Sequence, residues 1–352
     1  MPASAVAARC TAQLLSGAPA ATAEEAVRRV LAVQGQDPRG FRLAVRARTS
    51  GGTAAEVEAA LTGSRSLVVS WLNRGTLHLV EAADFWWLHD LTTPQLAKDS
   101  VRRLGQEGVP PPLAERGVAV VHDEVSEHGP RTRDELRVAL EGAGVPTTGQ
   151  ALVHVLLAAT LQHRLIRGPV RDGEHCMVLA EDWLGAAPPP LPREEALATL
   201  ARRYLAGHGP ATDRDLAMWA KLPLRDVRAG LAAIADETVD LGDGLLDLAE
   251  RAPAEPLPTR LLGNFDPILH GWVSRDPVLG AHEGNVVVGG IFRSWAFDAG
   301  RAVALWRIAG GRVRIAPFAR LPRRTEQALL ADAEAVVAYL GLPAKEPVLE
   351  AV

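Results

Sequence analysis

Two glutamines separated by a single residue, Gln34 and Gln36, are the side chains of this chain with the clearest chemical potential. Gln34 continues an apolar stripe that has the spacing of a buried helix face. A carboxamide at such a position needs hydrogen-bonding partners or water. Gly35 allows the backbone to leave the helix, and an extended chain beyond it directs both carboxamides to one side, where they can hold one water molecule. The apolar stripe consists of Val27, Val30 and Leu31. The competing interpretation of Gln34 and Gln36 is a polar helix end with ordinary caps.

Two elements must position this pair. The spacing of Thr22 and Glu25 is that of a helix N-terminus and predicts a helix over residues 24–34. Within residues 41–48, arginines lie on the side opposite Phe41, Leu43 and Val45, which predicts an extended segment after the glutamines. Arginines on its charged side can make bidentate contacts to phosphate, although a solvated strand face would show the same alternation. These arginines are Arg42, Arg46 and Arg48.

The composition indicates a folded globular protein. The chain has 352 residues, 47% hydrophobic and 23% charged, with a net charge of −4, a length that allows roughly two to four domains. Cys10 and Cys176 show neither metal-ligand spacing nor a disulfide framework. No apolar run is long enough for a membrane span and no signal-peptide pattern is present, so we expect a cytoplasmic protein without a membrane partner.

A repeat organises the middle of the chain. His128-Gly129-Pro130 returns 80 residues later as His208-Gly209-Pro210, and each copy is followed by a threonine at an N-cap position. A helix precedes each motif, two helices follow, and a β-hairpin closes each copy, which is the pattern of a winged helix-turn-helix. The expected helices cover residues 113–127, 133–141 and 149–163, then 193–206, 213–221 and 224–234, and the hairpins cover 165–180 and 238–248.

The fold class that follows is α+β. The N-terminal segment fits a looser version of the same unit, so the chain is expected to hold three tandem winged helix-turn-helix units. After residue 252, short strands at 286–290, 294–297, 302–308 and 312–317 and a helix at 325–340 predict a mostly-β domain closed by a helix. Proline-rich joints set the expected domains at residues 1–110, 111–187, 188–252 and 253–352.

The catalytic motifs that are absent narrow the function. The sequence has no Walker A loop, no His-Glu-x-x-His, no Cys-x-x-Cys and no Gly-x-Ser-x-Gly, so we expect no metal, no nucleotide and no other cofactor. His78 stands alone on a predicted strand and is more simply a structural hydrogen bonder than a catalyst. Asp266 before Pro267 is most simply a cap or turn residue.

Several of these segments together resemble the AlkZ/YcaQ-type family of winged-helix DNA glycosylases. The resemblance rests on the Gln34 motif, the repeated winged helices, and two further runs. The most specific part of the resemblance is Arg74-Gly75-Thr76-Leu77-His78-Leu79. Gly35 departs from the aliphatic residue that the family carries between its two polar residues. The two runs are Trp71-Leu72-Asn73-Arg74-Gly75-Thr76-Leu77-His78-Leu79-Val80 and Leu261-Leu262-Gly263-Asn264-Phe265-Asp266-Pro267.

This resemblance implies a catalytic pair, Gln34 and Gln36. Asp37, the next residue in the sequence, could supply charge if a stronger base were needed, and His78 is a further candidate for catalytic support. A guanine alkylated on its imidazole nitrogen is cationic and leaves without a strong general acid, so two neutral carboxamides that orient water fit the chemistry. The expected partner is double-stranded DNA with alkylpurine adducts, of the bulky or crosslinked kind for the Gln/Gln branch. We expect a monomer that hydrolyses without lyase activity. Arg74 joins the three arginines above as an expected DNA contact.

Two other classes of function stay open on the residues alone. A winged-helix regulator would bind DNA and release no base, and a protein-interaction module would show no salt-dependent DNA binding. Release of 7-methylguanine from alkylated DNA separates the enzyme from both.

Overall fold

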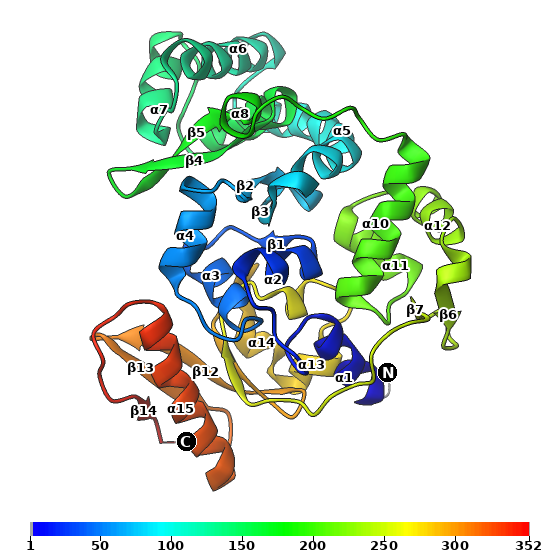
Figure 1. Cartoon of the computed structure of the whole chain (residues 1–352). Coiled ribbons are helices and arrows are strands. Elements are labelled where there is room, and N and C mark those ends of the chain that lie inside the picture. Colours follow the sequence, from blue (N-terminus) through cyan, green and yellow to red (C-terminus); the bar gives the residue numbers. More distant parts are fainter. Residues whose placement is uncertain (1–2, 352) are drawn as a thin grey trace. The chain divides into compact units, whose positions relative to one another are not determined.

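The computed structural model describes residues 3–351 and divides the chain into two compact units (Figure 1). The first unit combines Met1–Glu58 with Leu197–Val352, and the second is Ala59–Ala196. Residues 1–110, which the sequence predicts as one domain, are therefore shared between the units. None of the described helices is long and apolar enough to cross a bilayer.

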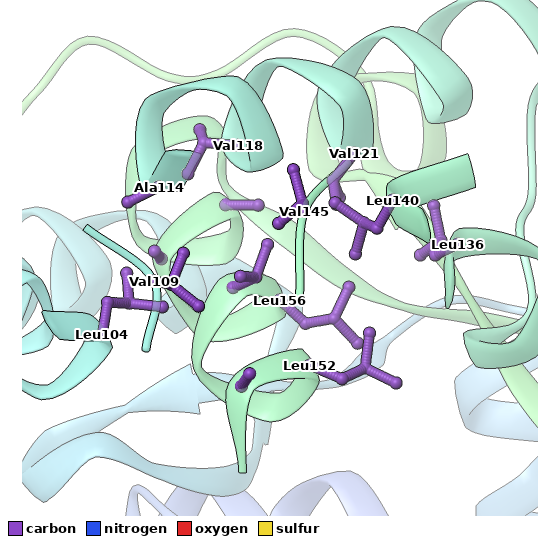
Figure 2. Close-up of a cluster of buried hydrophobic side chains, with 14 of the residues drawn as sticks. Leu104, Val109, Ala114, Val118, Val121, Leu136, Leu140, Val145, Leu152 and Leu156 are labelled. Carbon is purple, nitrogen blue, oxygen red and sulfur yellow. The ribbon is translucent and has the colours of Figure 1, made fainter. Parts of the chain in front are cut away.

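The second unit is a helical layer over a sheet. Its strands lie in the order β3-β2-β4-β5, with β2 and β3 antiparallel through the Asn73–Gly75 turn. Valines, leucines and alanines from the helices form its core, which Figure 2 shows around Val121, Leu140 and Leu156. The elements are β2 (Leu67–Leu72), β3 (Thr76–Glu81), α5 (Ala82–Gln106), α6 (Pro111–His128), α7 (Arg133–Gly142), α8 (Ala151–His163), β4 (Leu165–Arg171), β5 (Glu174–Leu179) and α9 (Ala180–Leu184).

The first unit holds the second copy of the repeat, apart from the first residues of α10. Its elements follow the expected order: α10 (Arg193–His208), α11 (Asp213–Ala220), α12 (Leu224–Ala232), β6 (Thr238–Asp240) and β7 (Leu246–Leu248). Thr132 and Thr212 both start their helices with a capping box, closed by Glu135 and Asp215. The caps are local features, which is why the sequence predicts these helices well. Superposition of the two copies stays a prediction.

The C-terminal part of the first unit is a sheet closed by a helix, as expected. Strand order is β14-β13-β12-β11-β8, and α15 (Arg323–Tyr339) packs on the sheet. The predicted strand at 286–290 is confirmed only at Val287–Val288, where β9 pairs with β10 in a small hairpin, because α14 (Glu283–Val286) takes up its first residue. The other elements are β8 (Arg260–Leu262), α13 (Asp276–Leu279), β9 (Val287–Val288), β10 (Ile291–Phe292), β11 (Trp295–Asp298), β12 (Arg301–Ala309), β13 (Arg312–Pro317) and β14 (Val348–Leu349).

The N-terminal segment differs most from its prediction. The first helices are α1 (Ala3–Ala12) and α2 (Ala23–Val30), then comes the short strand β1 (Val33–Gln34). Helix α2 stops at Val30, short of the predicted end at residue 34, because Leu31 turns to a φ of 64°. The predicted extended segment at 41–48 is also wrong. It lies mostly in helix α3 (Pro38–Arg46), which is followed by α4 (Ala54–Thr62).

The sequence carries the reason for α3. Asp37 caps the helix with its side chain and Pro38 occupies its first turn, where the missing N–H of proline costs nothing. Phe41, Ala44 and Val45 are buried at the i, i+3, i+4 spacing of a helix face. This face packs into the first unit, where Leu43 joins the core of the C-terminal sheet. Helix α3 thus anchors the glutamine motif on that sheet.

Candidate active site

The two glutamine side chains meet, as the sequence predicts. Gln34 Nε2 donates a hydrogen bond of 2.5 Å to Gln36 Oε1. From the sequence, Gln34 is expected at the end of a helix, but it belongs to strand β1. Residues two apart in an extended chain point to the same side, which brings the two side chains together. Gln34 is only 6% exposed, whereas Gln36 is exposed. One amide is therefore buried behind the other, and the outer one faces solvent.

Asp37, the next residue, is engaged in the fold. Its Oδ1 accepts a 2.6 Å hydrogen bond from the backbone N–H of Gly40, which makes it the N-cap of α3. A carboxylate at this position also interacts favourably with the positive end of the helix dipole. Asp37 thus fixes where the helix starts relative to Gln36.

Each of the three arginines predicted to contact DNA pairs with a carboxylate of the first unit. Arg42 pairs with Glu58 on α4, and Arg46 contacts Asp332 on α15 at 2.5 Å. Arg48, just beyond α3, is fully buried and pairs with Asp266 at 2.8 Å. The prediction that they alternate along an extended segment is wrong, because most of this segment is helix α3. Their contact with DNA stays a prediction. They join α3 to α4, to α15 and to the loop before Pro267.

The same loop closes over the start of α3. A Cβ on Gly40 would lie 2.7 Å from both oxygens of Asn264, so the close contact requires glycine. Asp266, predicted as a cap or turn residue, accepts a hydrogen bond from Ile268 N at 3.0 Å and also holds Arg48. This run, one of the two on which the family resemblance rests, is therefore part of the support of the glutamine motif.

His78 and Arg74 lie in the second unit. His78 is 1% exposed on β3, with Nδ1 2.9 Å from the Thr76 carbonyl oxygen and Nε2 3.4 Å from Arg74 Nη2. Burial and the neighbouring Arg74 charge lower the pKa of His78 to about 3. The imidazole is therefore neutral near pH 7, donating from Nδ1 and accepting from Arg74 at Nε2. Arg74 is half-buried with a φ of 55°.

A cavity of about 800 Å³ opens next to the glutamine motif, within the first unit. Asp37, Pro38 and Arg39 form one wall, and Asn264 and the β10–β12 region form the rest. Arg39 and Arg293 line this cavity, and within residues 3–351 neither has an ion-pair or hydrogen-bond partner for its guanidinium. Sequence reasoning missed both arginines, although the Asp37-Pro38 helix start places Arg39 in the first turn of α3.

Comparisons with known proteins agree with this picture. The chain is 26% identical over 307 residues to a protein named interstrand DNA cross-link repair glycosylase from Streptomyces sahachiroi, with 79% of this chain and 80% of that protein covered. Its structure is similar to that of Streptomyces sahachiroi DNA glycosylase AlkZ, with a TM-score of 0.78, 25% sequence identity and 99% of each chain covered. These matches support an enzyme rather than a regulator without activity.

A family model confirms the resemblance and the enzyme class that the sequence motifs predict. The model described as DNA glycosylase AlkZ-like matches residues 27–339, a range that contains the glutamine motif, both copies of the repeat and all but the last strand of the C-terminal sheet. The mixed helix and strand content agrees with the solved relative over the whole chain. The chain therefore belongs to the AlkZ-like family of DNA glycosylases.

Proposed function

We propose that this glycosylase hydrolyses the N-glycosidic bond of cationic 7-alkylguanines in DNA, with water positioned by Gln34 and Gln36. The observation that carries the proposal is the 2.5 Å bond between the two amides. Gln34 is buried and holds the exposed Gln36 in one orientation, which is what a residue that aligns water requires.

The chemistry suits neutral amides. Water attacks C1′ as the bond from C1′ to N9 breaks, the electron pair of that bond neutralises the alkylated base, and the water proton passes to solvent. A cationic leaving base needs no general acid, so the enzyme has to place the water and stabilise positive charge on the sugar. Carboxamide oxygens can do both, because their dipoles face a developing cation without first being protonated or deprotonated. Asp37 is engaged as a helix cap, which favours the glutamines over Asp37 as the groups that align the water.

Bulky natural-product adducts and interstrand crosslinks are the substrates we propose within this class. A relative is named for interstrand DNA cross-link repair, and the Gln/Gln form of the motif resembles the branch that acts on such lesions. We further propose that the protein acts as a monomer in the cytoplasm and leaves an intact abasic site. The neutral His78 beside Arg74 fits a structural role within the second unit rather than the transfer of a proton.

The test is release of 7-methylguanine from a duplex that carries this lesion at one position. The wild-type protein is expected to release the free base in single-turnover reactions. Gln36→Ala should release it slowly, while Asp37→Asn, which can still cap α3, should retain most activity. Wild-type rates in Gln36→Ala, together with loss of activity in Asp37→Asn, would assign the water to Asp37 instead.

A further inference from the structure

The cavity beside the glutamine motif is larger than a guanine with a methyl group requires. Its volume is about 800 Å³, within the range of sites that hold drug-sized molecules. It begins at Asp37, and neighbouring Cα atoms are about 3.8 Å apart, so it opens directly next to the backbone of Gln36. A base held in front of Gln36 would have this space within reach of a substituent.

The walls of the cavity suit an apolar, flat group. Phe292 and Trp306 contribute aromatic surface, and Trp306 is fixed because its Nε1 donates to the Leu262 carbonyl oxygen at 2.8 Å. Asn264 and Ser294 add neutral polar groups. The remaining apolar wall consists of Pro38, Leu305 and Ile308.

The charge of the cavity is positive. Asp37 contributes one negative charge, which faces the start of α3 as its cap, and Arg307 is paired with Glu350 at 3.1 Å. Arg39 and Arg293 have no such carboxylate within the described part of the chain. Arg39 also sits in the first turn of α3, where the helix dipole disfavours a cation. These two charges disfavour a cationic ligand and favour a neutral or anionic one.

We propose that this cavity holds the substituent carried by N7 of the damaged guanine and selects its chemistry. Apolar aromatic substituents and anionic ones enter, and cationic ones are rejected. This assignment rests on the proposed function of the glutamine pair. Ser294 and Ile308 set the space that is available, and Arg39 and Arg293 set the charge preference.

A filling variant tests the space. Duplexes with a single 7-methylguanine or 7-benzylguanine are compared in single-turnover base release. Ser294→Trp is expected to slow benzylguanine release about 10-fold or more, as filling of a substrate pocket does, and to leave methylguanine release within about threefold. Ser50→Trp, a matched change at an exposed serine outside the cavity, should affect neither. The proposal would be overturned if Ser294→Trp released both 7-benzylguanine and 7-methylguanine at the wild-type rates.

A charge variant tests the preference independently, since Ser294→Trp can disturb folding. The probes are 7-(2-carboxyethyl)guanine and 7-(2-aminoethyl)guanine, which differ mainly in charge. The wild type should prefer the carboxylate about 3- to 10-fold, as two partly screened charges predict, and the Arg39→Gln/Arg293→Gln double variant should lose this preference. If the double variant keeps the preference for the carboxylate lesion, or loses base release equally on every lesion, the arginines serve another purpose, such as contact with phosphate.

The two proposals fail in different ways. If the wild type releases no 7-methylguanine, the proposed function is wrong and the cavity assignment falls with it. If it releases 7-methylguanine while size and charge of the substituent are without effect in wild type and variants, only the cavity assignment is wrong.

Discussion

At the residue level, a hydrogen bond joins the amides of Gln34 and Gln36, and we propose that the two side chains act as one functional group. Gln34 donates to Gln36 from a buried position, so loss of Gln34 frees the rotation of Gln36, and loss of Gln36 removes the exposed amide. We expect Gln34→Ala or Gln36→Ala to lower 7-alkylguanine release by roughly 10- to 1,000-fold. Single-turnover rates of both variants measure this.

The double variant distinguishes a joint role from two separate ones. Gln34→Ala/Gln36→Ala should lose little more than the worse single variant, because the side chains act together. Binding to undamaged DNA should change little in all three, since neither residue carries charge. Additive losses would indicate separate roles, and wild-type rates in every variant would indicate a structural pair.

His78 makes a separate prediction about pH. Its pKa is lowered to about 3, so between pH 6.5 and 3 the unfolded chain takes up a proton that the folded protein does not. Stability must therefore fall as the pH falls through this window. Between pH 8 and pH 5 we expect this group to cost about 2 kcal/mol of unfolding free energy. Denaturant unfolding at both pH values, in wild type and His78→Asn, measures the difference.

The variant also carries the control. His78→Asn keeps a donor near the Thr76 carbonyl and has no titratable group, so its stability should be less sensitive to acid by the same ~2 kcal/mol. Equal pH dependence in both proteins would mean that His78 is protonated in the folded state.

At the scale of elements, the position of α3 decides the geometry of the site. Asp37 sets its start, and its arginines tie it to three neighbours through Glu58, Asp332 and Asp266. The Arg48–Asp266 pair is fully buried, so removal of one partner leaves an uncompensated charge in the core. We propose that these arginines hold the motif, whereas Arg39 and Arg293 of the cavity, which have no ion-pair partner among residues 3–351, can interact with a ligand.

Gly40 offers a direct test of this support. Gly40→Ala places a Cβ 2.7 Å from the Asn264 oxygens, so the loop that covers α3 must move. We expect base release to fall and the melting temperature to drop by several degrees, an overpacking cost of roughly 1–3 kcal/mol. Gly105→Ala in α5 is the matched control, because a Cβ there meets nothing within 4 Å. It should be neutral or stabilising by up to about 1 kcal/mol. Similar losses in both would point to a general effect of the added methyl group.

At the scale of the whole molecule, the distribution of cations argues for hydrolysis without lyase chemistry. A lyase needs an amine for a Schiff base, and the chain has only three lysines. Lys345 Nζ is bound to the Gly310 carbonyl oxygen at 2.8 Å, while Lys98 and Lys221 are exposed on α5 and after α11.

Borohydride trapping tests this expectation. With a lesion-bearing duplex that the protein processes, reduction should yield no covalent protein–DNA complex, and the abasic product should stay uncleaved until alkali is added. A trapped complex that disappears in one Lys→Met variant would identify a lyase and contradict the monofunctional assignment.

Features that depend on neighbouring residues could be predicted from the sequence alone. Thr132 and Thr212 start their helices with capping boxes, so the order of helices and hairpins in both copies of the repeat could be predicted. The pairing of Gln34 with Gln36 was predictable for the same reason, since residues two apart in an extended chain share a side. The family followed from short motifs whose residues are adjacent.

The ion-pair partners of the charged residues could not be predicted from the sequence. Helix α3 itself has a local cause in Asp37 and Pro38, but its contact with the C-terminal sheet through Leu43 could not be predicted from residue spacing. Arg46 forms an ion pair with Asp332 and Arg48 with Asp266, and both aspartates are far from the arginines in the sequence. The cavity likewise joins Asp37 to residues of β10–β12. Such partners meet only when the chain is folded, because no local spacing relates them.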